Sequence, residues 1–381
     1  MKTSSEKILT THVGSLPRSE AVTEGVFAKD DGVLEDEAAL EVTIAQAVDA
    51  VVRRQAETGV DVVSDGELSK ISYATYIAHR LTGFAGEGKR EPAQDLLDYP
   101  GAMRKRAALG TRSDRLPPVC VGEIQVKDLG PLNTDLANLQ HAIEQTPVTE
   151  AFMNAASPGV IALFQPNEFY PSHEAYLEAL GEAMRVEYEG IVQAGFLLQI
   201  DAPDIGMGRH TIFRNKSDAE FLKLAELHIE VLNHALRNIP ADRLRLHICW
   251  GNYEGPHHCD VPMELVLPIA LRANAQALLF EASNARHAHE WTVFRDADIP
   301  DDKILVPGVI DSTMNYIEHP QLVAERLCRF ADIVGRERVI AGTDCGFATF
   351  AGFGAVDADI VYAKLGALVE GAEIASQRMG S

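Results

Sequence analysis

One segment, residues 173–201, contains the pattern on which the architecture depends: HEAYLEALGEAMRVEYEGIVQAGFLLQID. A long amphipathic stretch ends before Gly195, and a short apolar run follows it and finishes at Asp201. A glycine commonly ends a helix, and a short apolar run is typical of a buried strand. The segment therefore predicts a helix followed directly by a strand.

The same order of helix, glycine and strand recurs at residues 36–65 and 321–344, and predicted helices at 218–237 and 262–275 also lead into apolar runs. Apolar strands that alternate with helices indicate a parallel sheet covered on both faces. The candidate strands are residues 8–13, 60–65, 157–163, 197–201, 244–249, 277–281, 304–310 and 338–343. Eight strands close a (β/α)8 TIM barrel, so we predict this α/β fold.

A ninth candidate strand, PVCVGEI at 118–124, lies in an irregular region of about 85–150. We interpret it as part of an excursion hairpin between strands 2 and 3, within a single domain spanning residues 1–381. A doubly wound open sheet is the alternative fold. It is disfavoured because no strand is followed by a GxGxxG or GxxxxGK[ST] phosphate loop.

The composition excludes several classes of partner. The 381 residues include 34 Lys and Arg against 56 Asp and Glu, a formal net charge of −22, which excludes a nucleic-acid binder held by phosphate electrostatics. No apolar run approaches the roughly 20 residues that cross a bilayer, so we expect no membrane association and a cytoplasmic protein. Five scattered cysteines favour free thiols over a disulfide framework. The sequence does not predict the oligomeric state.

Polar residues close three of the late strands, where a barrel carries its chemistry. LRLHICW places His247 and Cys249 two residues apart, so that both side chains point to one face of the strand. ALLFEA reaches Glu281, and RVIAGTDCGF reaches Cys345. One imidazole, two thiols and one carboxylate form a four-ligand set of the type that zinc takes.

Each of these positions also has a structural interpretation. His247 and Cys249 are compatible with a packed core histidine beside a buried thiol, Glu281 with a salt bridge at the barrel mouth, and Cys345 with a small residue in a turn. A competing ligand set, His257, His258 and Cys259, lies in EGPHHCD, a loop whose direction the sequence does not fix.

Earlier strands end in polar residues as well. His12 and Ser15 follow the first strand, Asp65 and Glu67 end the second, and Asp201 ends the fourth. Carboxylates that face the mouth of a barrel can hold the ammonium group of an amino-acid substrate. They are equally compatible with solvated charges in an acidic protein.

Taken together, the motifs resemble the catalytic barrel of the cobalamin-independent methionine synthase family and its shorter single-barrel relatives. The matching pieces span nearly the whole chain in the family's order: GSLP at 14–17, DGE at 65–67, QIDAPD at 199–204, HIC at 247–249, FE at 280–281, PGVID at 307–311 and DCG at 344–346.

This resemblance implies a zinc-dependent thiol alkyltransferase of methionine biosynthesis, which transfers a methyl group to homocysteine or a similar small thiol through a zinc-bound thiolate. It implies zinc ligands His247, Cys249, Glu281 and Cys345, and a thiol amino-acid pocket that touches Ser15, Glu67 and Asp201. The implied partners are a small-molecule thiol and an alkyl donor, with methyltetrahydrofolate as one candidate. No catalytic residue is assigned beyond the metal centre.

Two departures from the family pattern leave the alkyl donor open. The methionine synthases carry a histidine in a DIHS segment, whereas this chain reads Asp311, Ser312 and Thr313, so no proton donor is assigned. Residues 157–169 contain no tryptophan to stack on a pterin, with Phe164 as a substitute. The alternatives are epoxide opening by a zinc-activated thiol, as in epoxyalkane:coenzyme M transferases, and a non-catalytic zinc-stabilised binding protein.

Overall fold

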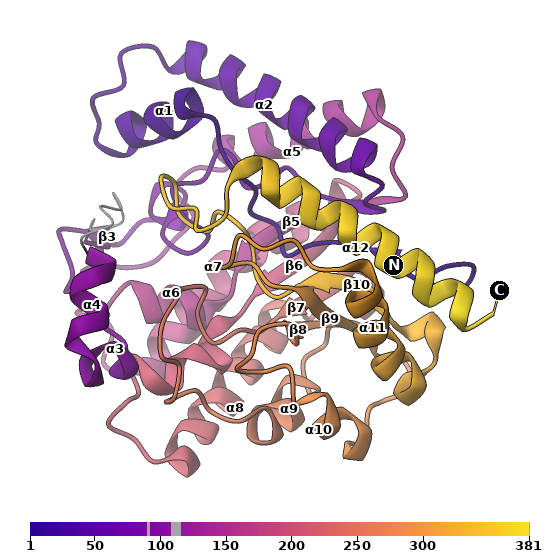
Figure 1. Ribbon diagram of the computed structural model, residues 1–381. Helices are drawn as coiled ribbons and strands as arrows, with labels where there is room; N and C mark the ends of the chain where they lie inside the picture. The colour runs from indigo at the N-terminus through magenta and orange to yellow at the C-terminus, as the bar shows by residue number, and fades with distance from the viewer. Residues whose placement is uncertain (90–91, 108–115, 381) are drawn as a thin grey trace.

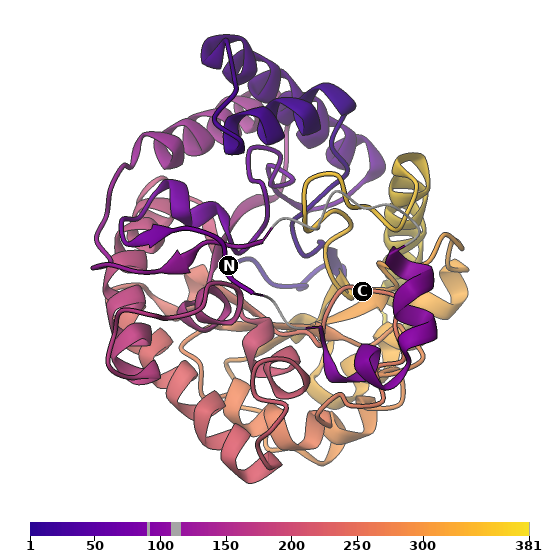
Figure 2. The same cartoon turned by 90° about the vertical axis from the view of Figure 1, so that its left-hand side faces the viewer.

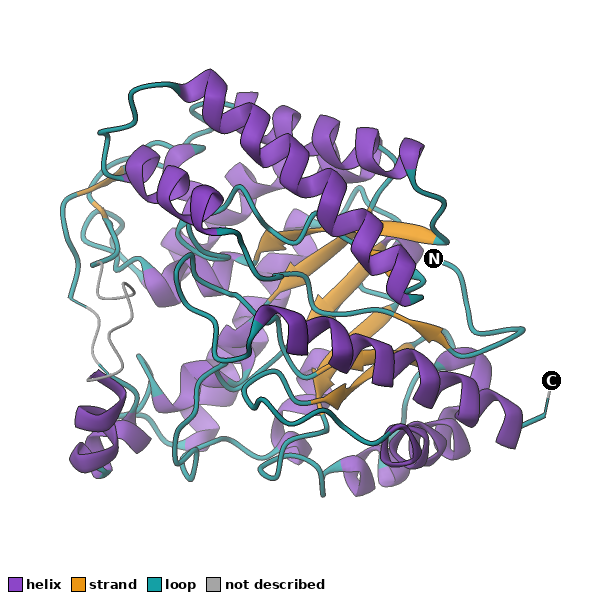
Figure 3. Cartoon of the chain, turned by 45° about the horizontal axis from the view of Figure 1, so that its top comes forward, coloured by secondary structure: helices purple, strands orange, loops and turns teal. Residues whose placement is uncertain are grey.

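The strands form a parallel, nearly closed barrel inside a ring of helices (Figures 1 and 2). The structure, a computed structural model, describes residues 1–89, 92–107 and 116–380. Its eight-stranded sheet has the order β1-β10-β9-β8-β7-β6-β5-β2. Figure 3 shows these strands enclosed by the helices. The predicted (β/α)8 TIM barrel is confirmed.

The barrel strands are β1 (Leu9–Thr10), β2 (Val62–Val63), β5 (Glu150–Ala156), β6 (Leu197–Asp201), β7 (Leu244–His247), β8 (Ala277–Glu281), β9 (Ile304–Ile310) and β10 (Ile340–Thr343). The helices are α1 (Glu20–Asp30), α2 (Glu37–Thr58), α3 (Gln94–Asp98), α4 (Pro100–Ala107), α5 (Gly130–Gln145), α6 (Pro158–Phe164), α7 (His173–Gln193), α8 (Asp218–Ala235), α9 (Met263–Ala270), α10 (Trp291–Asp296), α11 (Pro320–Val334) and α12 (Ala358–Arg378). Short 3-10 helices are η1 (Tyr76–His79), η3 (Pro203–Ile205), η4 (Met207–His210), η5 (Ala241–Arg243) and η6 (Arg336–Arg338). None of the helices in the described ranges is long and apolar enough to cross a bilayer.

Local signals set the ends of helix α2 as the sequence predicts. The Asp36 side chain accepts a hydrogen bond from the Ala39 backbone N–H and caps the first turn. Gly59 ends the helix with φ of 94°, a left-handed conformation that glycine adopts without steric cost. The chain then turns directly into β2.

Side chains bridge β1 and β2, the two ends of the strand order. The Thr11 hydroxyl donates to the Val62 carbonyl over 3.0 Å, and the Asp61 backbone N–H donates to the Thr10 hydroxyl over 3.1 Å. The Thr10 N–H in turn donates to the Asp61 carboxylate over 3.0 Å. These bonds satisfy buried polar groups where the ladder between neighbouring strands ends.

The prediction of a strand at 157–163 is wrong, because these residues belong to helix α6. The Ser157 side chain accepts from the Val160 N–H, and Pro158 occupies the first helical position, where its fixed φ suits a helix and its missing N–H costs nothing. The third strand is instead β5, just before this cap. A short apolar run alone does not distinguish a buried strand from a buried helix.

The excursion predicted between strands 2 and 3 contains a small antiparallel pair, β3 (Phe84–Ala85) and β4 (Val119–Cys120), but these strands are not joined by a short hairpin turn. Helices α3 and α4 lie between these two strands in the chain, and Figure 1 places them on the side of the molecule opposite the termini. Residues 90–91 and 108–115 of the excursion lie outside the described residues.

A buried ion network fixes the start of the excursion to two helices of the ring. Arg80 Nη1 lies 2.9 Å from Glu187 Oε2 of α7, and Arg80 also pairs with Asp135 of α5. The Tyr76 hydroxyl donates to the same Glu187 carboxylate over 2.5 Å. All four side chains are buried.

We expect Arg80→Met to destabilise the protein by about 3–5 kcal/mol, because it leaves two carboxylates buried without their cation. Urea unfolding followed by circular dichroism measures this loss. Lys29→Met is the matched control: it breaks an ion pair with Glu37 whose side chains are 41 % and 63 % exposed, and such pairs contribute about 0–1 kcal/mol. Equal losses in the two variants would contradict the expectation.

Candidate active site

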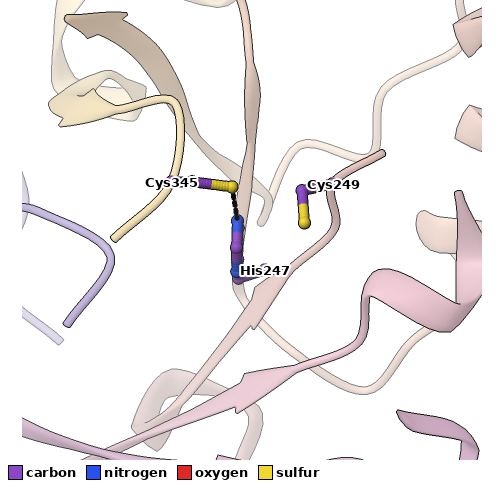
Figure 4. A group of neighbouring side chains, drawn as sticks. All are labelled: His247, Cys249 and Cys345. Carbon is purple, nitrogen blue, oxygen red and sulfur yellow. Dashed lines mark hydrogen bonds between the residues drawn. The ribbon is translucent and has the colours of Figure 1, made fainter. Parts of the chain in front are cut away.

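Three of the predicted ligands converge at the carboxyl end of the barrel. His247 is the last residue of β7, Cys249 follows two residues later, and Cys345 comes directly after Asp344 beyond β10. One donor atom from each lies within 4.8 Å of the other two, and all three residues are buried. Figure 4 shows the side chains pointing toward one another, with Cys345 Sγ 3.8 Å from His247 Nε2.

These separations fit a zinc-type ion. Tetrahedral zinc with bonds of about 2.0 Å to nitrogen and 2.3 Å to sulfur holds such donors about 3.5 Å apart. The observed nitrogen–sulfur distance of 3.8 Å is close to that value. Two thiols and one imidazole are also soft donors that disfavour magnesium and calcium.

The loop after β10 reaches the site because Gly346 packs tightly on Ser15. A Cβ atom at Gly346 would lie 2.0 Å from the Ser15 hydroxyl, so a larger residue would push the loop away. The Phe347 N–H donates to the Ser15 carbonyl over 2.9 Å, which ties the loop to the segment after β1. Cys345 is thereby held beside the β7 residues.

Glu281, the fourth predicted ligand, is not a member of this three-residue group. Its Oε1 accepts from the Trp250 backbone N–H over 2.8 Å. Its Oε2 accepts from Asn284 Nδ2 over 2.7 Å and from Arg286 Nη2 over 2.6 Å. The carboxylate thus lies at the edge of the site and accepts three hydrogen bonds from protein groups. The sequence analysis did not identify Asn284 and Arg286; the signal for them was the polar run ASNAR just after β8.

Asp201 positions His247. The two residues are direct partners in the parallel pairing of β6 and β7, and Asp201 Oδ1 lies 3.1 Å from His247 Nδ1. Asn154 Nδ2 donates to the other carboxylate oxygen over 2.8 Å. This contact leaves His247 Nε2 directed at Cys345, an arrangement that orients a histidine for metal binding.

The charge state of the cluster follows from its burial and its partners. Burial lowers the pKa of His247, but the hydrogen bond with Asp201 and the charge of Cys249 outweigh burial and raise this pKa to about 8. A hydrogen bond from Cys345 lowers the pKa of the Cys249 thiol, and the same contact, with burial, raises the pKa of Cys345. One of the two thiols therefore ionises before the other.

A cavity of about 110 Å³, open to solvent at its mouth, lies against the cluster. Six of the seven predicted site residues line it: Ser15, Glu67, Asp201, His247, Cys249 and Cys345. Its apolar wall contains Tyr73, Phe164, Met207, Phe350 and Phe353. Asn252 and Tyr253 also line the cavity; the sequence analysis missed both, because they lie on a loop whose path it did not fix.

Glu67 brings a titratable carboxyl group to the cavity. Burial raises the pKa of Glu67 to about 7; nearby Lys70 opposes the shift, and Asp201 adds to it. The residue has φ of 56°, and Arg18 Nη2 donates to its carbonyl over 2.6 Å. A left-handed conformation in a residue other than glycine is uncommon and marks a position that its surroundings hold in place.

Three aromatic rings form one wall of the cavity. Tyr73 lies 5.6 Å from Phe164 and 5.8 Å from Phe350 between ring centroids, and the two phenylalanines are 6.0 Å apart. Phe164 comes from α6, the segment predicted to be a strand, and still reaches the cavity.

The segment that replaces the family histidine contacts a residue of the cavity wall. The Ser312 hydroxyl is 3.0 Å from Asn252 Oδ1, and Thr313 Oγ1 donates to Asp311 Oδ1 over 2.8 Å. Asn252 Nδ2 donates to the Gly346 carbonyl over 2.7 Å. Asp311 and Ser312 are buried, and Thr313 is half-buried.

Fold and site define a TIM-barrel protein whose candidate site residues lie at the carboxyl ends of its strands. The sequence matches the family model described as the catalytic domain of cobalamin-independent synthase over residues 8–373. The chain belongs to this family, so the resemblance is confirmed and the chain is an enzyme, not a non-catalytic binding protein.

Known relatives match this chain in sequence over almost its full length. The chain is 24% identical over 373 residues to a methionine synthase of Saccharolobus solfataricus, covering 97% of this chain and 95% of the relative. It is also 24% identical to a methionine synthase of Sulfurisphaera tokodaii, covering 97% and 93%. A solved B12-independent methionine synthase from a Shewanella species, in complex with selenomethionine, has the same fold, with a TM-score of 0.74, 20% identity and 98% of each chain covered.

We expect Asp201→Asn to lower the pKa of His247 from about 8, because the hydrogen bond and charge of Asp201 then no longer oppose burial. Histidine ring NMR signals followed through a pH titration of metal-free protein measure this pKa. Asp204→Asn is the control, since Asp204 contacts His228 instead, over 2.8 Å. An unchanged His247 titration in Asp201→Asn would show that the contact does not set the pKa.

Proposed function

We propose that this chain is a zinc-dependent S-methyltransferase that transfers a methyl group to homocysteine. The observation that carries the proposal is the convergence of His247, Cys249 and Cys345 beside the cavity. The chain belongs to the cobalamin-independent synthase family, and its relatives named methionine synthase match 97% of its length. The zinc ligands in this proposal are these three residues together with Glu281.

Zinc at this site would supply thiol activation. A free thiol of pKa about 8.5 is mostly protonated at neutral pH, and coordination to zinc shifts it to the thiolate form that attacks carbon. Asp201 keeps the His247 ring in the orientation that presents Nε2. Asn284 and Arg286 hold the Glu281 carboxylate beside the cluster, where it would complete the ligand set.

The carboxyl groups in the cavity favour an amino-acid thiol. Glu67 and Asp201 both line it, and an ionised pair of carboxylates attracts the ammonium group of homocysteine. The same charges would repel the sulfonate of coenzyme M, so the cavity supports the epoxide-opening alternative less well.

The aromatic wall is suited to the methyl donor. Tyr73, Phe164 and Phe350 present apolar rings next to the cluster, against which a flat ring such as the pterin of methyltetrahydrofolate can pack. Holding donor carbon and thiol sulfur in one cavity converts a reaction between two solutes into a positioned one. We propose no proton donor among Asp311, Ser312 and Thr313.

We expect Cys345→Ala to lose bound zinc and methyl transfer together, because the remaining donors form an incomplete set. Metal analysis of the purified protein and thioether formation by mass spectrometry measure the two losses. Cys120→Ala is the control, since Cys120 is buried in β4, outside this cluster. Full turnover by Cys345→Ala without bound metal would refute the mechanism.

We expect kcat/KM for homocysteine to fall as the pH drops below about 7. Glu67 is ionised above its pKa of about 7 and holds the ammonium group there; below that pH it is protonated and the attraction is lost. Glu67→Gln should lower kcat/KM by about 10–100-fold at pH 8, the equivalent of a charged hydrogen bond, and remove this limb of the profile. If kcat/KM of Glu67→Gln still falls below about pH 7, another titratable group causes that fall.

A further inference from the structure

A second group of metal-binding side chains lies on the surface, outside the cavity. It consists of Asp98, at the end of α3, and His258 and Cys259, in the loop between β7 and α9. Their donor atoms lie within 4.8 Å of one another. His258 Nε2 is 3.0 Å from Asp98 Oδ2, and Cys259 Sγ is 3.8 Å from the same oxygen. We name these three residues the surface triad.

The triad differs from the set that the sequence suggested in this loop. His257 turns away from its neighbours: it has φ of 52°, its ring stacks on Tyr253 at 4.1 Å, and its Nδ1 contacts Asp260 over 3.1 Å. Asp98, 160 positions earlier in the chain than His258, takes the place beside His258 and Cys259. No pattern in the sequence connects these two segments.

The distances in the triad fit a metal of zinc type. Tetrahedral zinc would hold a nitrogen and an oxygen donor about 3.3 Å apart, and a sulfur and an oxygen donor about 3.5 Å apart. The observed separations, 3.0 and 3.8 Å, bracket these values. A thiol, an imidazole and a carboxylate are all zinc ligands, and a soft thiol disfavours calcium and magnesium.

The electrostatic setting also favours a cation. The carboxylates of Asp98, Asp95 and Asp260 lie near the Cys259 thiol, and their negative charges attract a cation. The His258 and Asp98 side chains are about two-fifths exposed, so an ion can reach them from solvent.

We propose that the surface triad is a second binding site for a transition-metal ion of zinc type, separate from the buried cluster of His247, Cys249 and Cys345. An ion there would join α3 of the excursion to the loop after β7. The same helix already contacts this loop through Asp95, which accepts from the Tyr253 hydroxyl over 2.8 Å and from the His257 N–H over 2.9 Å. Because Tyr253 lines the cavity, the ion would fix the excursion next to the cavity mouth.

Zinc stoichiometry tests the proposal. Full-length protein without an affinity tag is reduced, stripped with a chelator, dialysed against Zn²⁺ alone and analysed for metal. Wild-type protein should bind about two zinc ions per chain, and Cys259→Ala and Asp98→Asn about one, because each variant removes one of three ligands. Cys328→Ala is the matched control, since this half-buried thiol on α11 lies outside both groups, and it should keep the wild-type number.

Cobalt provides a second readout that does not depend on turnover. In Cys249→Ala/Cys345→Ala, loaded with Co²⁺ alone, a sulfur-to-cobalt charge-transfer band should remain and should disappear when Cys259→Ala is added. A wild-type protein that binds one zinc ion, with no change in Cys259→Ala, would overturn the surface site. If Cys345→Ala loses only the ion of the buried cluster, this result bears on the proposed function, and the surface triad should still bind its ion.

Discussion

The hydrogen bond between Asp201 and His247 couples the pairing of the barrel strands to the orientation of a candidate site residue. The residues face each other because β6 and β7 are paired in parallel with Asp201 opposite His247. Both are buried, so a shift of one residue in this register would leave an imidazole and a carboxylate without partners at a cost of several kcal/mol. The register that builds the barrel is therefore the register that aims His247 at Cys345.

Several buried carboxyl groups lie at the site. Burial raises the pKa of Asp344 to about 7, and Glu281 and Asp311 add to the shift, although backbone N–H groups of Ala282 and Ser283 donate to it over 2.9 Å. Burial also raises the pKa of Glu67, which lines the cavity. A pocket with this surplus of negative charge suits positively charged occupants, which in the proposed reaction are a metal ion and an ammonium group.

The sequence was sufficient for what depends on periodicity and insufficient for what depends on the path of loops. Alternating helices and apolar runs predicted the barrel, and the strand ends identified His247, Cys249 and Cys345, because parallel strands bring their carboxyl ends to one edge. The strand predicted at 157–163 failed because its apolar run also suits a short buried helix with a Ser157 cap. The distance of Glu281 from the cluster and the contribution of Tyr253 depend on side-chain contacts that no local pattern encodes.

The contact between β1 and β2 differs from the other strand contacts of the barrel, because side chains make it. Elsewhere around the ring, neighbouring strands share backbone ladders, whereas here Thr10, Thr11 and Asp61 make the connection. Fewer hydrogen bonds must break for these two strands to separate, so local opening of the barrel costs least free energy between β1 and β2. β1 leads directly to Ser15 in the cavity, and Ser15 contacts Gly346, so loosening of β1 would act on the position of Cys345 as well as on the cavity wall. Flexing of this wall and the placement of Cys345 are thus coupled through one contact.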